Sequence, residues 1–155
     1  MDSSDKAKYI IKNAEVMVVA TADHNGKPWI SPVGFQPDEN YNLYWVSHSG
    51  ALHSQNIKSR PEVAIVIVGK NPDGNNDGVY FDDKATELDD EAEITKAITI
   101  LAARPKDAKF DINTLDQVTG EAVWRIYKAE PVEVSKRADD TLKGQAITVR
   151  EKIEL

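Results

Sequence analysis

One segment of this sequence decides the fold: Tyr41-Asn42-Leu43-Tyr44-Trp45-Val46-Ser47-His48-Ser49-Gly50-Ala51-Leu52-His53-Ser54-Gln55-Asn56-Ile57. Its first seven residues are rich in aromatic and β-branched side chains, a composition typical of a β-strand. The residues after Gly50 have helical spacing, with Leu52 and Ile57 as the apolar positions. Pro61 then ends the helix, because the residue before a proline avoids helical geometry. The segment therefore predicts a strand that leads directly into a short helix.

The junction between this strand and this helix carries hydroxyl and imidazole side chains. Free backbone N–H groups and the positive end of the helix dipole both favour an anion at the start of a helix. The junction is therefore a candidate anion site. Two simpler interpretations stay open: Ser49 serves as the helix N-cap, and His48 and His53 are solvated surface residues.

Composition limits the class of protein. The chain has 155 residues, of which 41% are hydrophobic and 29% are charged, and we expect a single domain over residues 1–155. A net charge of −7 argues against nucleic acid as the main partner, because no basic stripe offsets it. The chain contains no cysteine, which excludes disulfides, thiolate catalysis and zinc–thiolate sites.

The distribution of polar and apolar residues also predicts no targeting signal. The first twenty residues are polar and amphipathic, unlike a signal peptide. The longest apolar run, Val63–Val68, is too short to span a bilayer. We therefore expect a cytoplasmic protein that has no membrane partner.

Two elements are predicted before the first turn of the sheet. Ala7–Asn13 has helical spacing and follows capping residues, so it predicts a short opening helix. Glu15–Thr21 is nearly continuous in apolar residues, which favours a central strand covered on both faces. Asn25-Gly26 then predicts a tight reversal, since this pair tolerates positive φ.

The next strand, Trp29–Phe35, contains an anomaly. Pro32 cannot donate a ladder hydrogen bond, and Gly34 brings no side chain. Such residues indicate a sheet edge, a bulge or a place where the sheet opens. Two interpretations stay open: the backbone of Ser31, Val33 and Gly34 faces a ligand, or the strand is merely bulged.

The second half of the chain continues the alternation of strands and turns. Its predicted elements are a fully apolar core strand at Val63–Val68, strand residues at Gly78–Phe81 and Ala85–Leu88, a helix from Asp89 to about Arg104, a polar connection from Pro105 to Thr114, strands at Ala122–Tyr127 and Pro131–Val134, and a last edge strand or partner-binding arm within 139–155.

The predicted fold class is mainly β. Six or seven strands joined mostly by hairpins, without βαβ alternation, favour a small antiparallel β-barrel with peripheral helices. The sequence has no Gly-rich phosphate loop, metal-spaced His/Glu set or Gly-x-Ser-x-Gly elbow. The residues themselves therefore name no catalytic acid, base or nucleophile.

Three groups of residues, in this order, resemble the pyridoxamine 5′-phosphate oxidase-like FMN-binding split barrels over roughly residues 14–133. The groups are Val19-Ala20-Thr21 with Gly26-Lys27-Pro28 and Ser31-Pro32-Val33; Leu43-Tyr44-Trp45-Val46-Ser47 with Asn56-Ile57 and Pro61-Glu62-Val63-Ala64; and Gly78-Val79-Tyr80 with Ala85-Thr86-Glu87-Leu88 before a helix.

The resemblance implies a six- to seven-stranded split barrel that forms a homodimer and holds FMN in clefts between the subunits. It implies a flavin-dependent oxidoreductase that acts on a small molecule, with a non-enzymatic flavin-binding or sensing protein as the alternative. The residues implied beside the flavin ring are Ser31, Pro32, Val33 and Gly34, and those implied near the phosphate and ribityl chain are Ser47, His48, Ser49, His53, Ser54 and Asn56. Arg125 either adds charge there or faces solvent.

One departure from the family pattern concerns this phosphate. Many members carry an Arg-Lys pair three to four residues before the asparagine that Asn56 matches, and Leu52 and His53 stand there in this chain. One branch resembles this chain in carrying His-Ser, as His53-Ser54 does. The departure lowers the positive charge expected at the phosphate. A third hypothesis is a relative that binds a different cofactor, such as a deazaflavin or heme, or none. Oxidation of pyridoxamine phosphate itself would need a second basic set, which the sequence does not show.

Overall fold

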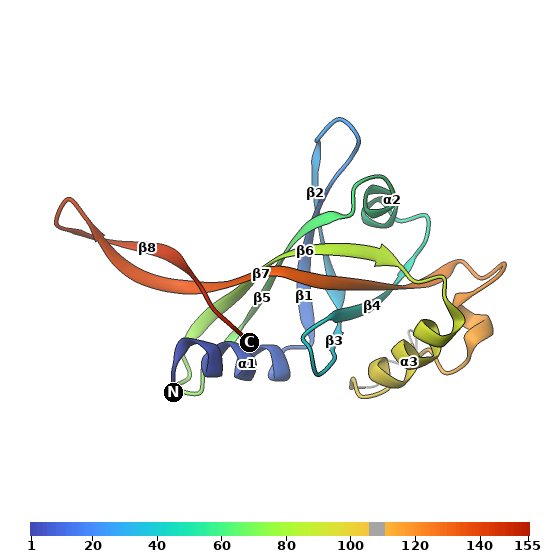
Figure 1. Cartoon of the computed structure of the whole chain (residues 1–155), viewed down its shortest axis with the longest axis horizontal. Helices are drawn as coiled ribbons and strands as arrows, with labels where there is room; N and C mark the ends of the chain where they lie inside the picture. The colour runs from blue at the N-terminus through green and yellow to red at the C-terminus, as the bar shows by residue number, and fades with distance from the viewer. Residues whose placement is uncertain (106–110) are drawn as a thin grey trace.

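The computed structural model of the chain describes residues 1–105 and 111–155. Its antiparallel strands form one curled sheet, a half-barrel with helices around it (Figure 1). The mainly β antiparallel barrel predicted from the sequence is thereby confirmed.

Seven strands follow the order β2-β1-β5-β6-β7-β4-β3, and β8 pairs with β7 outside this path. Each neighbouring pair is antiparallel. The strands are β1 (Val16–Ala22), β2 (Pro28–Gly34), β3 (Gln36–Pro37), β4 (Leu43–His48), β5 (Glu62–Lys70), β6 (Asn76–Glu87), β7 (Trp124–Leu142) and β8 (Gln145–Lys152).

The helices lie at the periphery of the half-barrel (Figure 1). They are α1 (Ser3–Asn13), α2 (Leu52–Ser59) and α3 (Glu91–Leu101), and a 3-10 turn, η1, covers Leu115–Val118. The helix α3 ends before the predicted boundary at Arg104, which lies in the turn that follows. The polar connection predicted from Pro105 to Thr114 includes residues 106–110, which lie outside the described residues. No helix in the described ranges 1–105 and 111–155 is long and apolar enough to cross a membrane.

The core fills the concave side of the sheet. Trp45 and Tyr127 are almost completely buried there, and their rings stack at a centroid distance of 5.6 Å. Phe35 and Phe81 belong to the same cluster, and Ile10 from α1 closes it from one side. A second apolar cluster joins α3 to the outer faces of β4 and β7. Where α3 covers the sheet, it therefore has apolar contacts on both faces.

The prediction that Glu15–Thr21 is covered on both faces, and that Val63–Val68 is wholly core, is wrong. Both strands alternate between buried and accessible residues. Val16 is 51% exposed and Val68 is 63% exposed, because none of the described helices covers the outer side of β1 and β5. Each continuous apolar run therefore combines buried residues on the inner face of the sheet with uncovered apolar residues on its outer face.

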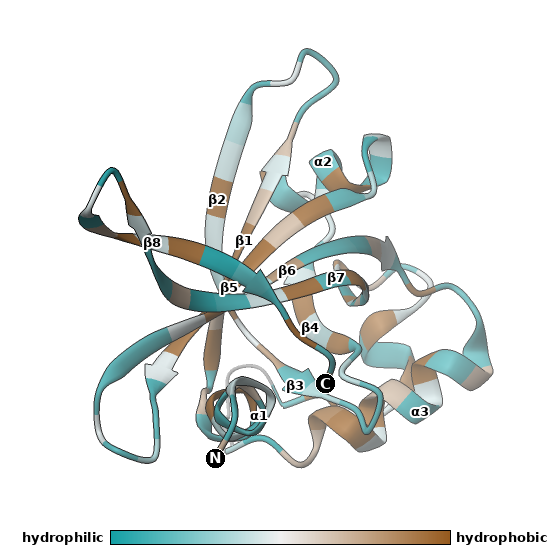
Figure 2. Cartoon of the chain, turned by 60° about the vertical axis from the view of Figure 1, so that its left-hand side comes forward, coloured by the Kyte–Doolittle hydropathy of each residue, from teal (hydrophilic) through white to brown (hydrophobic). Residues whose placement is uncertain are grey.

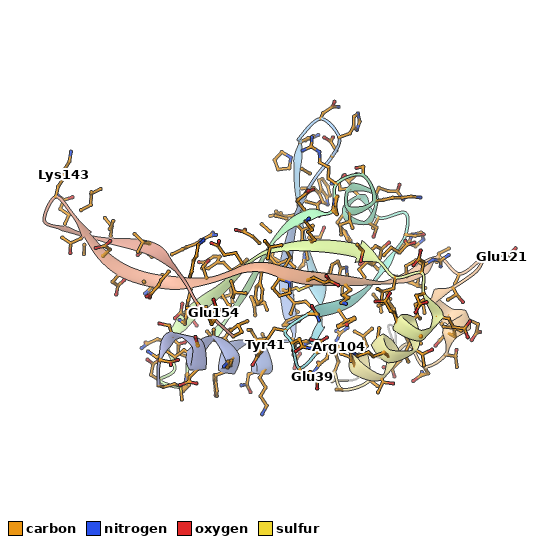
Figure 3. The ribbon with its side chains drawn as sticks, in the orientation of Figure 1. Glu39, Tyr41, Arg104, Glu121, Lys143 and Glu154 are labelled. Carbon is orange, nitrogen blue, oxygen red and sulfur yellow. The ribbon has the colours of Figure 1, made fainter. Side chains whose placement is uncertain are left out.

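The two strands predicted at Ala122–Tyr127 and Pro131–Val134 are parts of one long strand, β7. A register shift opposite Asp82 and Asp83 lets this strand bend and continue past the barrel. Beyond the barrel β8 is its only partner among the described strands, so the two strands project as an arm with Lys143 at its tip (Figure 3). The tail thus forms the predicted edge strand, and contact with a partner stays a prediction.

The register shift coincides with a buried carboxyl group that lacks a partner among the described residues. Asp83 is 2% exposed, and neither of its side-chain oxygens has a hydrogen bond there. Burial, and secondly the negative charge of Asp82, raises the pKa of Asp83 from 3.8 to about 7. The neutral acid is therefore the form that the fold accommodates.

Asp83→Asn should make the protein more stable above neutral pH. Because folding raises the Asp83 pKa, the native protein loses stability as the pH rises from the unfolded pKa to the folded one, and stays less stable above it. The asparagine removes this penalty, which we expect to be roughly 2–4 kcal/mol at about pH 8 and near zero at acidic pH.

Urea unfolding at acidic and alkaline pH measures this effect, with Asp139→Asn on the exposed β7–β8 arm as the matched control. An equal gain for Asp83→Asn at both pH values would mean that ionisation of Asp83 is not the cause.

Candidate functional site

A pocket opens where the two ends of the sheet path approach each other. The edge strand β2 forms one wall, and β4 with the start of α2 forms another. The cavity has a volume of about 320 Å³, in the range of small-molecule sites. We call it the edge pocket, and its lining residues are Pro32, Val33, Gly34, Val46, Ser47, His48, Ala51, His53, Arg104 and Trp124.

His53 and Ser47 form the polar pair of the edge pocket. The imidazole Nε2 of His53 lies 2.8 Å from the hydroxyl oxygen of Ser47. Burial lowers the pKa of His53 below its usual 6.5, because the shielded position disfavours the charged form. The neutral imidazole is thus favoured at physiological pH, and an anion placed beside it would favour the cation.

His48 is exposed at the mouth of the pocket and is oriented by two contacts. Its Nδ1 accepts a hydrogen bond of 2.9 Å from the backbone N–H of Gly50. Its ring meets the ring of Trp124 edge-on at 5.7 Å. Because Nδ1 is the acceptor, the neutral imidazole carries its proton on Nε2. His48, a lining residue of the pocket, therefore has its hydrogen-bond donor at Nε2 in the neutral form.

Arg104 enters the pocket from the turn after α3 and lies on the backbone of Gly34. A Cβ atom built on Gly34 would be 2.0 Å from Nη2 of Arg104 and 2.7 Å from Cζ. A side chain at position 34 would therefore require the flexible end of Arg104 to move. The close approach that the sequence predicts at Gly34 is therefore made, in this chain, by a side chain of the protein itself.

The edge pocket is electropositive within a negatively charged protein. The chain carries a net charge of −7, yet no aspartate or glutamate is among the described residues that line this cavity. Arg104 supplies a permanent cation, while His53 supplies a conditional one. The arrangement favours a ligand that carries negative charge.

Six of the eleven predicted cofactor residues line the edge pocket: Pro32, Val33, Gly34, Ser47, His48 and His53. Their contact with a cofactor stays a prediction. Ser31 is partly buried on β2 outside the lining. Ser49 is engaged through its backbone, because its N–H donates to Val123 and its carbonyl accepts from Gln55. It is not the N-cap of α2, since that position belongs to Ala51.

The polar side chains of Ser54 and Asn56 lie behind the pocket, inside the fold. Asn56 is 3% exposed, and its Nδ2 donates a hydrogen bond of 3.0 Å to the hydroxyl of Thr21 on β1. Ser54 is equally buried, between α2 and the barrel interior. The structure therefore gives Asn56 a role in fixing α2 to the sheet.

Arg125 is occupied by backbone groups. Its Nη2 donates to the carbonyl of Gly120 at 2.7 Å, and its Nη1 donates to the carbonyl of Trp124 at 2.8 Å and to that of Ala122. These bonds close the turn that precedes β7. Arg125 is therefore neither the solvent-facing residue nor a lining residue of the edge pocket.

Sequence reasoning missed Val46, Ala51, Arg104 and Trp124 among the lining residues. Val46 and Trp124 are each next to a predicted site residue in the sequence, so the predicted strands already indicate that they lie near the site. Arg104 had no local signal, because its pocket partner Gly34 is seventy residues earlier in the chain.

Arg125→Lys tests the structural role of Arg125. A lysine cannot donate to three carbonyl groups in the fixed directions of the guanidinium. We expect a loss of about 1–3 kcal/mol in the free energy of unfolding, since two or three hydrogen bonds from a charged group are lost or weakened. Urea unfolding measures it, with the exposed Arg137→Lys as control. Equal stability of both variants would contradict this role.

The sequence profile of the pyridoxamine 5′-phosphate oxidase family matches residues 3–136 of this chain. Comparison with curated protein sequences finds no match.

Several solved structures share the fold. HutZ, the heme storage protein of Vibrio cholerae, is 18% identical and superposes with a TM-score of 0.65, covering 84% of this chain and 91% of HutZ. A FAD-binding protein of Mesorhizobium loti is 16% identical, with a TM-score of 0.66, and the match covers 88% of this chain and 94% of that protein. A heme-binding protein of Mycobacterium smegmatis is 17% identical, with a TM-score of 0.70, over 96% of this chain but 58% of that protein. The common fold thus occurs in flavin-binding and heme-binding proteins.

Proposed function

Because this chain belongs to the pyridoxamine 5′-phosphate oxidase family, we propose that it binds FMN in the edge pocket and acts as a flavin-dependent oxidoreductase on a small molecule. One observation carries the proposal. The pocket joins the backbone of an unpaired sheet edge to imidazole, hydroxyl and guanidinium groups, and its described lining contains no carboxylate. A phosphorylated flavin needs such an environment for its anionic end.

The residues present fit this cofactor. His53 and Ser47 would hold the phosphate at the start of α2, and the backbone of Pro32 to Gly34 would lie beside the ring. FMN supplies the redox chemistry when it is bound, whereas the chain supplies position, hydrogen bonds and exclusion of water. Pro32 has no N–H, so its carbonyl is the one main-chain polar group that this residue can offer a ligand.

The spectrum of the purified protein, followed by identification of the molecule released on denaturation, tests the cofactor. Reduction by NADH or NADPH and reoxidation by a candidate substrate separate an oxidoreductase from a non-enzymatic flavin-binding or sensing protein. A deazaflavin or a Soret band from heme would contradict FMN.

Heme has less support from this pocket than FMN has. A histidine that ligates a metal usually donates its other ring N–H to a neighbour. In His48 the other nitrogen accepts from the backbone N–H of Gly50 instead. His48 is therefore not arranged in advance as an axial ligand.

Binding of FMN should be coupled to protonation of His53. The pKa of His53 is lowered by burial in the free protein, and the phosphate dianion would raise it in the complex. Binding then takes up a proton, so the contribution of His53 is full at low pH and is lost as the pH rises through the pKa of the complex. Protonation of the phosphate near pH ~6 opposes this trend at the acidic end.

We therefore expect His53→Asp to weaken FMN roughly ten- to a hundredfold or more, and His53→Lys to keep its affinity at alkaline pH, where the wild type weakens. Titration of FMN across neutral and alkaline pH measures this. His24→Asp, in the β1–β2 turn, is the control for the charge change. If the His53→Asp and His53→Lys variants bind FMN alike, His53 does not face the phosphate.

A homodimer is the assembly that we propose, because the outer side of β2, β1 and β5 is apolar and uncovered by the described chain. The register places Val18 between Pro32 on β2 and Val66 on β5, so these side chains share one face. Ile30 is 68% exposed and Val68 is 63% exposed on the same strands. Figure 2 shows hydrophobic segments on these strands. A second copy on this face would remove the apolar area from water.

Val68→Glu should convert the dimer into a monomer, because it places a charge in an apolar interface. Sedimentation at micromolar concentration measures the association. The matched control is Val132→Glu, since Val132 is 69% exposed but stands on β7. A monomeric wild type that binds flavin would contradict both the dimer and this interface.

A further inference from the structure

The free edge of β8 is an open row of backbone hydrogen-bonding groups in the described part of the chain. There β8 pairs only with β7, and the N–H of Ile153 donates a hydrogen bond of 3.0 Å to the carbonyl of Val134. The register continues from this pair to Leu142 opposite Gln145. Because the residues of an antiparallel strand bond alternately to one side and the other, four residues of β8 direct their N–H and C=O groups away from β7: Ala146, Thr148, Arg150 and Lys152.

The free edge of β2, by contrast, is blocked by prolines. Asp23 donates to the carbonyl of Lys27 at 3.1 Å and Phe35 to that of Glu15 at 3.2 Å, so the odd-numbered residues of β2 bond to β1. The outward-facing residues of β2 are then Pro28, Ile30, Pro32 and Gly34. Two of these four have no N–H, which protects an edge strand against pairing with another chain. None of the four outward residues of β8 is a proline, so β8 lacks this protection.

The arm that carries this edge consists of two strands. β7 pairs with β6 only as far as Lys136, so β7 and β8 project together beyond the barrel (Figure 1). A two-stranded hairpin is at best marginally stable by itself in water. The large apolar residues of the arm beyond Lys136 all stand on one face: Leu142, Ile147 and Val149. Leu142 is 58% exposed, and the other two are half-buried. A further strand beside β8 would therefore stabilise the arm.

The described chain on either side of residues 106–110 is held away from this arm. Arg104 follows α3, and Ile112 packs against the same apolar cluster as α3. Figures 1 and 2 both show α3 on the opposite side of the barrel from β8. A strand for the free edge of β8 would therefore come from another chain.

We propose that β8 pairs through this edge with β8 of a second copy, antiparallel to it and about a two-fold axis at Thr148. Identical strands that pair in this way form a closed, isologous contact. Ile147 then lies opposite the second copy's Val149, which brings four β-branched side chains together on the apolar face. On the other face the two Thr148 residues meet, and Ala146 lies opposite Arg150. No like charges stand directly opposite each other in this register.

Other registers of the same pairing are less favourable. An axis at Val149 would place Ile147 opposite Glu151, and an axis at Arg150 would place two arginines directly opposite each other. An axis at Ile147 would place Val149 opposite Gln145. The sequence of β8 is therefore most complementary to a second copy of itself when the axis lies at Thr148.

This contact goes beyond the proposed function and is independent of flavin binding. It is also separate from the outer face of β2, β1 and β5. Pairing over a single strand belongs to the small interfaces, which bury less than about 1,200 Å² and bind weakly. We therefore expect it at higher protein concentration than the homodimer proposed above. In Val68→Glu, which disrupts the outer-face contact, β8 is the remaining contact that we assign between copies.

Sedimentation of Val68→Glu from micromolar to nearly millimolar concentration tests the pairing. We expect the mass to rise from one copy to two. Adding Thr148→Pro should raise the dissociation constant roughly tenfold or more, because proline removes the outward N–H at the centre of the contact and spares the bonds to β7. The matched control is Thr141→Pro, on the opposite edge of the same arm, which should leave the dissociation constant unchanged. Thermal unfolding identifies any variant that has lost its fold.

Disulfide formation tests the position of the axis, because the chain has no cysteine of its own. The Cα atoms of a hydrogen-bonded antiparallel pair lie about 5.5 Å apart, within the range that a disulfide spans. Thr148→Cys should therefore form covalent dimers under mild oxidation roughly tenfold faster than Ala146→Cys, which would lie opposite Arg150 instead of its own counterpart. Thr141→Cys measures the rate of chance collisions.

Three results would overturn the proposal. Val68→Glu stays monomeric over the whole concentration range, Thr148→Pro and Thr141→Pro associate alike, or Thr148→Cys forms covalent dimers no faster than the other two cysteine variants. If Val68→Glu is not monomeric at micromolar concentration, the outer-face interface is wrong, and the comparison of the two proline variants in the wild-type background decides the role of β8. A protein that binds no flavin would contradict the proposed function and leave this test unchanged.

Discussion

The failure of the sheet to close is the constraint on which the rest of this structure depends. In the described chain β2 is paired only with β1, and β4 pairs with β7 and the two-residue β3. Closure would satisfy the backbone groups of both edges and leave no space between them. Pro32 prevents such pairing at one position because it has no N–H to donate, and Gly34 leaves room for Arg104. The gap that these residues keep open is the edge pocket.

A binding site built on two edges needs rigid walls, and buried polar contacts supply them. Asn56 fixes α2 to β1 through Thr21, while Arg125 closes the turn before β7. Neither contact lies in the pocket, yet each one fixes an element that contributes lining residues to it. The stacked rings of Trp45 and Tyr127 join β4 to β7 behind the same wall. Asn56 and Arg125 are thus bonded within the fold, whereas the side chains of Ser47, His48 and His53 line the pocket.

The sequence predicted the strand–turn–helix segment and the edge character of β2 because these depend on local chemistry. It failed where tertiary placement decides. The apolar run Val63–Val68 is half exposed, since none of the described helices lies over its outer side. Arg125 and Arg104 also show that the sequence does not indicate which side chains the tertiary structure brings to the pocket. Arg125 was itself predicted as a site residue and binds backbone carbonyls, whereas Arg104, in the turn after α3, lines the pocket.

The net charge of the whole chain and the charges that line the edge pocket have different effects on an anion. Net charge acts on solubility and on the long-range approach of partners, and at −7 it disfavours anions. Within the edge pocket the nearest charges dominate, because low-dielectric walls weaken screening and strengthen each local interaction. An anion that reaches the pocket therefore meets Arg104 and a protonatable His53 before it meets the distant carboxylates. An anion beside His53 would favour the charged imidazole, which would add a second positive charge to that of Arg104.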